Sequence, residues 1–362
     1  MKMKPVLLSF CLLPALAHAE LYITVVEGLG GMPEYQEQFD TQREDVVGAA
    51  HSMTDASRVA EFSSADATRE KVLAHFAELT SKMTADDRAA IYLIGHGSFD
   101  GTDYKFNISG PDISAADIKD VMDKLPGKNH FLVNTSSTSG AMVEALVGED
   151  KEAQPEKFIV VAATRNGVER NATQFGRFFV DALTSSEADL NKNNNISIQE
   201  AYDFADRGVT AYFESEGKLA TEHPQLRGAG AAQFSLARLS DSQTANVSED
   251  SLLSDLLKQR QELDAKIEDL QLRRAEFSNA EYIEQLQALV LQSAELSEKI
   301  DAEQGNQDGA NVDSATGVEE ASVAAEKVQI TIPSAAELQR NIEAPAAQTT
   351  IQPAGGDGAT RQ

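Results

Sequence analysis

A histidine and a run of hydroxyl side chains are the residues of this chain with the clearest chemical potential. His96 lies between Gly95 and Gly97, and a later segment reads Asn134-Thr-Ser-Ser-Thr-Ser-Gly140. A glycine at 97 allows its backbone N–H to face a substrate carbonyl. Taken alone, a glycine-flanked histidine is usually a turn residue and a Ser/Thr run usually caps a helix. Taken together, the two segments predict a base and a nucleophile at one site.

A second segment follows the pattern of a twelve-residue calcium loop. It reads Asp189-Leu-Asn-Lys-Asn-Asn-Asn-Ile-Ser-Ile-Gln-Glu200, with oxygen-bearing residues at the positions that bind calcium. Asn194 stands where glycine is usual, and asparagine tolerates the left-handed conformation. Two carboxylates predict modest affinity and a stabilising role for the ion. The alternative is an Asn-rich turn that caps a helix beginning near Gln199. The expected ligands are Asp189, Asn191, Asn193, Asn195 through its carbonyl, Ser197 and Glu200.

Strands and helices alternate along the segment that must position these residues. Buried-type apolar runs or alternation predict strands over 21–26, 89–94, 104–108, 131–133 and 158–162. Helical spacing predicts helices over 69–83, 114–125, 140–146, 171–183 and 199–214. Ser114 and Asp117 resemble a capping box that opens the second of these helices. This order implies right-handed crossovers and a mostly parallel sheet, whose working edge lies beyond the carboxyl ends of the strands. Three loops are expected at that edge: Gly28–Gly31, Gly95–Phe99 and Asn134–Gly140.

Two of these segments resemble motifs of a known family. Tyr92-Leu-Ile-Gly-His96-Gly-Ser-Phe-Asp-Gly101 resembles the histidine motif of caspase-like and legumain-like cysteine peptidases. Thr135-Ser-Ser-Thr-Ser-Gly-Ala-Met142 resembles the legumain motif Glu-Ala-Cys-Glu-Ser-Gly-Ser-Met. The resemblance spans roughly residues 21–225. Within the family, the chain resembles a bacterial legumain-like subgroup most. It implies an α/β fold, a caspase-like three-layer sandwich with a mostly parallel sheet, followed by a C-terminal α-helical hairpin.

The resemblance also implies roles for individual residues. His96 would be the base, Ser137 would replace the catalytic cysteine, and the N–H groups of Gly97 and Ser137 would form an oxyanion hole. A thiol with a pKa of about 8.5 ionises readily beside an imidazolium. A serine hydroxyl instead needs a base held by a third group. Asp100 and Asp112 are candidates for that third group by proximity in sequence only.

The N-terminus predicts export. Lys2 and Lys4 precede an apolar run from Val6 to Leu16, and Ala17-His-Ala19 fits a cleavage site. The alternative, a lipoprotein signal using Cys11, is disfavoured by the bulky Phe10. Cys11 is the only cysteine. Cleavage after Ala19 would therefore leave a periplasmic or secreted protein with no disulfide, no thiolate nucleophile and no thiolate metal ligand.

The composition and the C-terminal third complete the expected organisation. A net charge of −27 disfavours nucleic acid and anionic membranes as partners, and no later stretch is apolar enough to span a membrane. Apolar stripes predict a helical hairpin or coiled coil with a second helix capped by Ser278 and Glu281. The expected parts are a signal peptide (1–19), a caspase/legumain-like domain (20–238), the hairpin (248–303) and a disordered tail (304–362), with 328–332 as a strand-like exception.

Three functions remain open from the sequence. The first is a binding or scaffold protein that keeps the peptidase fold without conventional cysteine peptidase activity and recruits a protein or peptide partner through its hairpin or tail. The second is a serine-dependent endopeptidase that uses a Ser137/His96 dyad. The third is a calcium-stabilised module whose groove binds peptide without cutting it. Weaker signals are a Gly28–Gly31 anion loop, for which a rim loop is the simpler reading, and Glu222-His-Pro224, where His223 is expected to be structural.

Overall fold

A computed structural model describes residues 19–148, 155, 157–239 and 252–312 of the chain. The predicted signal sequence up to residue 18, the strand-like segment 328–332 and the tail beyond Val312 lie outside these residues. The chain divides into a first unit, Met1–Asp308, and a second unit, Gly309–Gln362.

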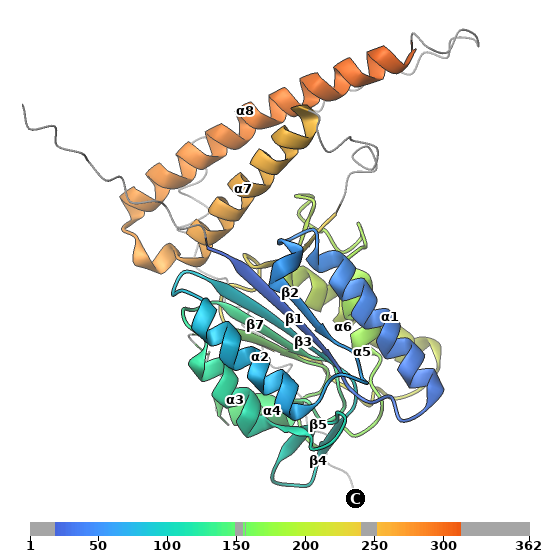
Figure 1. The fold of residues 1–362 in the computed structure, drawn as a ribbon. Helices are drawn as coiled ribbons and strands as arrows, with labels where there is room; N and C mark the ends of the chain where they lie inside the picture. Colours follow the sequence, from blue (N-terminus) through green and yellow to red (C-terminus); the bar gives the residue numbers. More distant parts are fainter. Residues whose placement is uncertain (1–18, 149–154, 156, 240–251, 313–362) are drawn as a thin grey trace, which may run out of the picture. The chain divides into compact units, whose positions relative to one another are not determined.

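A six-stranded sheet forms the centre of the fold (Figure 1). Its strand order is β10-β8-β7-β3-β1-β2, and all neighbouring pairs are parallel except β10 with β8. The predicted α/β class with a mostly parallel sheet is therefore confirmed. The strands are β1 (Leu21–Glu27), β2 (Val59–Phe62), β3 (Arg88–Ile94), β7 (His130–Asn134), β8 (Phe158–Ala162) and β10 (Gln225–Arg227).

Helices cover both faces of this sheet, as its apolar strands require (Figure 1). One core lies under α1 (Pro33–Ala50), α5 (Phe175–Ala182) and α6 (Ile198–Ser215). The other lies under α2 (Arg69–Lys82), α3 (Ala115–Lys124) and α4 (Gly140–Val147). The predicted capping box of α3 is present, with Ser114 and Asp117 bonding reciprocally.

Two small sheets and a short 3₁₀ helix also belong to the described part of the domain. β4 (Gly97–Phe99), β5 (Tyr104–Phe106) and β6 (Ile113–Ser114) form an antiparallel sheet, in which β4 and β6 are the edges. β9 (Asn195–Ser197) pairs with β11 (Ser235–Arg238), and η1 spans Ala56–Arg58. α5 begins at Phe175 rather than at the predicted residue 171, because Glu222 accepts the backbone N–H groups of Gln174 and Phe175 and fixes the helix start there.

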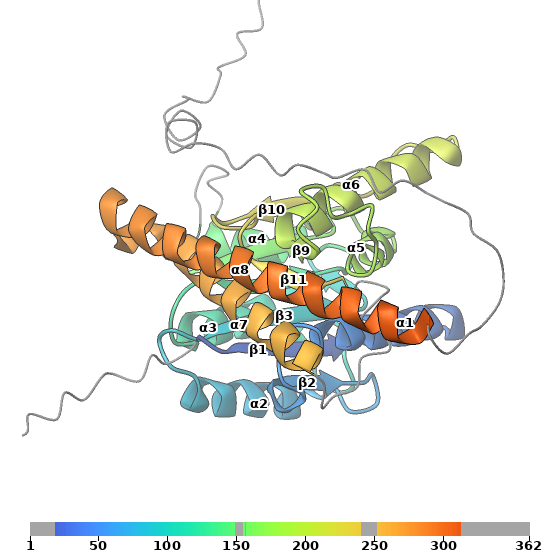
Figure 2. The same cartoon turned by 90° about the horizontal axis from the view of Figure 1, so that it is seen from above.

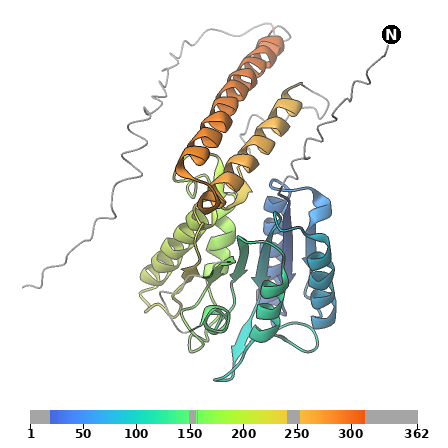
Figure 3. The same cartoon turned by 90° about the vertical axis from the view of Figure 1, so that its left-hand side faces the viewer.

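Two long helices follow, α7 (Leu252–Leu272) and α8 (Asn279–Val312), with η3 (Arg274–Glu276) between them (Figure 3). Leu253 and Leu256, early in α7, pack with Leu296 and Ile300, late in α8. The two helices are therefore antiparallel, and they run side by side in Figure 2 as well. The predicted capping box of Ser278 and Glu281 is present. α8 continues past the predicted end of the hairpin at residue 303.

Candidate functional site

The three loops expected at the working edge follow neighbouring strands. β7, β3 and β1 are adjacent in the sheet, so the segments after Asn134, Ile94 and Glu27 leave it side by side. The Gly28 N–H donates to the Ile94 carbonyl at 2.8 Å, which holds the first loop against the second.

The histidine loop and the hydroxyl loop touch at Gly97. The Ser137 hydroxyl donates to the Gly97 carbonyl at 3.1 Å. A Cβ atom at position 97 would lie only 2.5 Å from both the Ser136 hydroxyl oxygen and the Ser137 carbonyl oxygen. Only glycine permits this approach without a shift of the backbone. The structure therefore brings the predicted residues Ser137 and Gly97 together.

The backbone N–H of Gly97 points away from strand β5. Asn107 N–H bonds the His96 carbonyl, which makes Gly97 and Phe106 a non-hydrogen-bonded pair of the antiparallel ladder. Both polar backbone groups of Gly97 consequently face the side on which Ser137 lies. Among the described residues, the Ser137 N–H has no acceptor. Two backbone donors are thus available at the place where the resemblance implies an oxyanion hole.

Three other hydroxyls of the run hold the loop in place, whereas the buried Thr138 hydroxyl has no hydrogen-bond partner among the described residues. The Ser136 hydroxyl contacts the Tyr104 hydroxyl at 2.7 Å, and the Asn134 amide donates to the same Tyr104 oxygen. The Thr135 hydroxyl donates to the Leu93 carbonyl, and the Ser139 hydroxyl contacts that of Thr164. Ser137 is therefore the member of the run whose hydroxyl reaches the histidine loop.

Thr138 has an unusual backbone conformation for a β-branched residue. Its φ is +59°, and its N–H donates to the Glu169 carbonyl at 2.9 Å. A β-branched side chain in the left-handed region stores strain that the surrounding structure must compensate. The loop that follows β8 supplies that support, because it contains Glu169. The turn immediately after Ser137 is thus strained and anchored.

His96 is enclosed by aromatic rings rather than hydrogen-bonded to Ser137. Its ring centroid lies 4.8 Å from that of Tyr35 and 5.0 Å from that of Phe39, both edge-on. No hydrogen bond joins His96 and Ser137, although both lie within the described part of the chain. Burial lowers the pKa of His96, while a hydrogen bond with the backbone of Gly30 opposes that shift. The imidazole is accordingly neutral at pH 7 and able to accept a proton.

Neither carboxylate suggested by the sequence orients this imidazole. Asp100 accepts the backbone N–H groups of Thr102 and Asp103 within its own turn. Asp112 accepts the N–H of Ile108. Both carboxylates are therefore engaged with loop backbone, and neither hydrogen-bonds to His96 in the described structure.

The predicted calcium loop is closed by its own hydrogen bonds. Asp189 accepts the N–H groups of Asn193 and Asn194 at 3.1 and 2.9 Å, and Asn194 adopts a φ of +61°, as position 6 requires. Glu200 accepts the Leu190 N–H at 3.1 Å and the Ser197 hydroxyl at 2.7 Å. The Asp189 and Glu200 side chains are both buried.

The remaining expected calcium ligands also have partners within or beside the loop. The side-chain oxygens of Asn191 and Asn193 accept backbone N–H groups two residues ahead. Asn195, whose expected ligand is its backbone carbonyl, accepts a hydrogen bond from Arg238 on its side-chain oxygen. The six expected calcium ligands surround one turn, but several of their oxygen atoms already accept hydrogen bonds from the protein. Among the described residues no group of three or more His, Cys, Asp or Glu side chains is placed to hold a metal ion. The donor set suits a weak oxygen-liganded cation rather than a transition metal.

Helix α1 supplies site residues that the sequence did not indicate. Tyr35 and Phe39 contact His96, and Gln36 and Arg43 contact the buried Glu27 at the end of β1. A usable signal was present: Pro33 at a helix start after a Gly-Gly pair, then Phe39 and Val46 one heptad apart. The Nδ1 atom of His223 lies 2.7 Å from a Glu169 carboxylate oxygen.

No protein-family profile matches the sequence, and no curated protein is significantly similar to it. Distant similarity to solved structures was found. Protein GSU0716 from Geobacter sulfurreducens overlaps 61% of this chain and 100% of its own, with a TM-score of 0.41 and 11% identity. Caspase-1 from Spodoptera frugiperda overlaps 58% and 87%, with a TM-score of 0.39 and 10% identity. A pro-sf-caspase-1 structure overlaps 58% and 88%, with a TM-score of 0.39 and 13% identity. At these low identities and TM-scores, the similarities support no inference about activity or site residues. None of the described helices is both long enough and apolar enough to cross a membrane.

Proposed function

We propose that this chain is an exported caspase/legumain-like protein that binds an extended peptide without conventional cysteine peptidase activity. The observation that carries the proposal is the bond from the Ser137 hydroxyl to the Gly97 carbonyl. It directs the hydroxyl proton toward a backbone acceptor instead of the imidazole. The predicted loss of Cys11 with the signal sequence leaves no thiol to take the place of Ser137.

Strand β4 supports peptide as the ligand. The Asp100 N–H bonds the Asp103 carbonyl, so Phe99, like Gly97, belongs to a non-hydrogen-bonded pair. The polar backbone groups of both residues therefore lie on the free edge of β4. An extended peptide can pair with such an edge through its main chain. Ser137 already uses the Gly97 carbonyl in the same way.

A serine-dependent endopeptidase is the second candidate. The free N–H groups of Gly97 and Ser137 and the neutral imidazole of His96 favour it. In that mechanism His96 would take the Ser137 proton as the oxygen attacks a peptide carbonyl, and would pass it to the departing amine. Water would then hydrolyse the acyl ester. Hydrogen bonds of this kind often tighten only when substrate binds.

A fluorophosphonate probe separates the two candidates. A binding module leaves the wild-type protein unlabelled at Ser137 under conditions that label a known serine hydrolase. A hydrolase shows labelling that disappears in Ser137→Ala and persists in Thr138→Ala, the adjacent hydroxyl that serves as the matched control. Peptide mapping of the labelled protein identifies the modified residue.

Export, partner recruitment by the hairpin, and calcium belong to the same proposal. Amino-terminal sequencing of the protein from the periplasm or medium tests cleavage after Ala19. Pulldown with the full chain and with a variant lacking residues 248–303 tests whether the hairpin recruits a protein partner. Calcium would act at Asp189–Glu200 as a stabilising ion, away from the loops of Ser137 and His96.

A further inference from the structure

Exposed apolar side chains gather on two loops of the working edge. In the described part of the domain, residues 19–239, the large apolar side chains that are exposed are Leu29, Met32, Val168, Leu190 and Leu219. The first three lie on the loops that follow β1 and β8. Single exposed apolar residues are common on protein surfaces, but three of them at one edge of the sheet indicate a binding surface.

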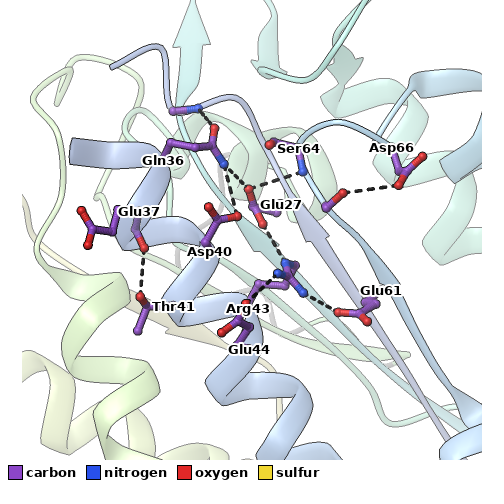
Figure 4. A network of polar contacts seen from close by, with 12 residues as sticks. Glu27, Gln36, Glu37, Asp40, Thr41, Arg43, Glu44, Glu61, Ser64 and Asp66 are labelled. Atoms are coloured by element: carbon purple, nitrogen blue, oxygen red, sulfur yellow. Dashed lines mark hydrogen bonds and ion pairs between the residues drawn. The ribbon is translucent and has the colours of Figure 1, made fainter. Parts of the chain in front are cut away.

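The loop after β1 is held in place by helix α1 (Figure 4). The Gly30 N–H donates to the Gln36 side-chain oxygen at 3.1 Å, and the Gln36 amide nitrogen donates to a Glu27 carboxylate oxygen. The Glu27 side chain is fully buried and bonds Arg43 Nε at 2.7 Å. The turn that carries Leu29 is therefore tied through α1 to the end of β1.

The loop after β8 is anchored as well. Its Glu169 carbonyl accepts the Thr138 N–H at 2.9 Å, and its Val168 N–H donates to the Asn166 side-chain oxygen at 3.0 Å. When an apolar side chain stands on a fixed backbone, only its own rotamers must be restricted as a ligand binds. The exposed side chains of both loops are therefore preorganised contact points.

Strand β4 runs between the two loops. At its start, the Asn107 N–H donates to the His96 carbonyl, and the Asn107 carbonyl accepts the Leu29 N–H. At its end, the Phe99 ring packs against Gly167, where a Cβ atom would collide with the ring. A peptide paired with the free edge of β4 would therefore extend toward the loop after β1 at one end and toward the loop after β8 at the other.

The sheet order sets the distance between the two loops. β8, β7, β3 and β1 are consecutive strands. Adjacent strands lie about 4.8 Å apart, so the outer two are roughly 14 Å apart. An extended peptide rises about 3.3 Å per residue and covers this distance with about four residues. Because residues i and i+4 of an extended chain point to the same face, two such side chains can reach both loops at once.

We propose that the β4 edge selects an extended peptide with large apolar side chains at two positions four residues apart. Leu29 and Met32 contact one of these side chains, and Val168 contacts the other. The inference rests on the proposed function and names the class of peptide that the edge binds. Main-chain pairing with β4 is open to any extended peptide, whereas the two loops provide the selection.

The test compares two fluorescent peptides. One carries two leucines four residues apart in a glycine-serine background, and the other carries serine at both positions. Fluorescence anisotropy measures the Kd of each peptide for the full chain. Val168→Ser and Leu29→Ser each remove a contact point. Leu219→Ser is the matched control, because Leu219 is also exposed but lies between α6 and β10, outside the two loops.

The expected result depends on the leucines and on the two loops together. The wild type should bind the two-leucine peptide roughly tenfold more tightly than the serine peptide. Val168→Ser and Leu29→Ser should each weaken the binding of the two-leucine peptide by about fivefold and leave that of the serine peptide unchanged. Leu219→Ser should change neither Kd. Because all three substituted side chains are exposed, the variants should fold as the wild type does.

Failure of the apolar selection differs from failure of peptide binding. Equal binding of both peptides to the wild type, or equal losses in Val168→Ser and Leu219→Ser, would overturn the selection and leave peptide pairing with β4 in place. Binding of neither peptide would overturn peptide binding itself. A third peptide with its leucines five residues apart points them to opposite faces, and the selection predicts that it binds no better than the serine peptide.

Discussion

The hydroxyl of Ser137 donates to the backbone carbonyl of Gly97 across 3.1 Å, and this bond joins the loops that follow β7 and β3. The acceptor is one residue from His96, so the alcohol and the imidazole lie on neighbouring loops without bonding each other. An approaching peptide that pairs with β4 would compete for the same carbonyl. Ser137 is therefore placed to respond to a ligand whether or not it reacts.

The close approach at Gly97 predicts a large cost for a single added methyl group. Gly97→Ala places its Cβ 2.5 Å from the Ser136 hydroxyl oxygen and the Ser137 carbonyl oxygen, and overpacking of this kind costs about 1–3 kcal/mol. Urea denaturation measures the loss. The control is Gly48→Ala on α1, where the new methyl group meets nothing within 4 Å and helix propensity favours alanine by roughly 0.5–1 kcal/mol. Equal stability changes in the two variants would refute the close packing at Gly97.

Burial of His130 predicts acid sensitivity. It is fully buried, its Nδ1 atom accepts the Ala89 N–H at 3.1 Å, and burial lowers its pKa to about 4 from an ordinary 6.5. The unfolded chain binds the proton first as the pH falls. The contribution of neutral His130 to the free energy of unfolding is thus complete above pH 6.5. As the pH falls from 6.5 to 4, roughly 3 kcal/mol of it is lost. Denaturation at several pH values should give a smaller loss for His130→Gln, and an unchanged pH slope would contradict this assignment.

Burial of Glu222 predicts that stability falls as the pH rises, which is opposite to the effect of His130. Burial raises its pKa to about 7 from an ordinary 4.5, although the N–H groups of Gln174 and Phe175 oppose the shift. The folded protein therefore holds the proton that the unfolded chain releases. This contribution is complete below pH 4.5 and is lost as the pH rises through 7.

The Glu222 contribution is measured by difference, because it opposes that of His130 between pH 4.5 and 6.5. We subtract the free energy of unfolding of the wild type from that of Glu222→Gln at each pH. This difference should rise between pH 4.5 and 6.5 and level off above pH 7. The variant also loses one acceptor for the start of α5, which offsets the difference by a constant of about 1 kcal/mol. A difference independent of pH would show that Glu222 is ionised throughout.

The calcium proposal predicts a thermal shift. At a calcium concentration ten times Kd, the folded state gains about 1.4 kcal/mol, which raises the Tm by a few degrees. Chelator should reverse the gain, and magnesium should give less because it demands near-ideal octahedral geometry and gives up its bound waters reluctantly. Asp189→Asn, which keeps the shape and removes one of the two carboxylates, should lose the response. No calcium-dependent shift in the wild type would mean that the internal hydrogen bonds of Asp189 and Glu200 are the whole role of the loop.

The features predicted correctly from sequence are those that local patterns determine. The buried strands β3, β7 and β8 are short apolar runs, and the capping box at Ser114 and Asp117 is written in four consecutive residues. The meeting of Gly97 and Ser137 also follows from sequence, because adjacent parallel strands end at one edge.

The features that were missed depend on contacts between distant segments. Helix α1 buries Phe39 and Val46 but also the polar Gln42, so its apolar stripe is weak. The burial of Glu27 depends on Arg43 from that helix. The direction of the Ser137 proton depends on which acceptor the folded backbone presents, and no pattern in the Ser/Thr run reveals that.

The proposal stands or falls on whether the edge of β4 beside Ser137 binds extended peptide without cutting it. The most direct measurement is to equilibrate the mature protein with a library of unstructured peptides and to follow retention and cleavage together by mass spectrometry. We expect the protein to retain peptides that stay intact, and Ser137→Ala to leave them equally intact. Cleavage products that appear with the wild type and vanish with Ser137→Ala, or a failure to retain any peptide, would contradict it.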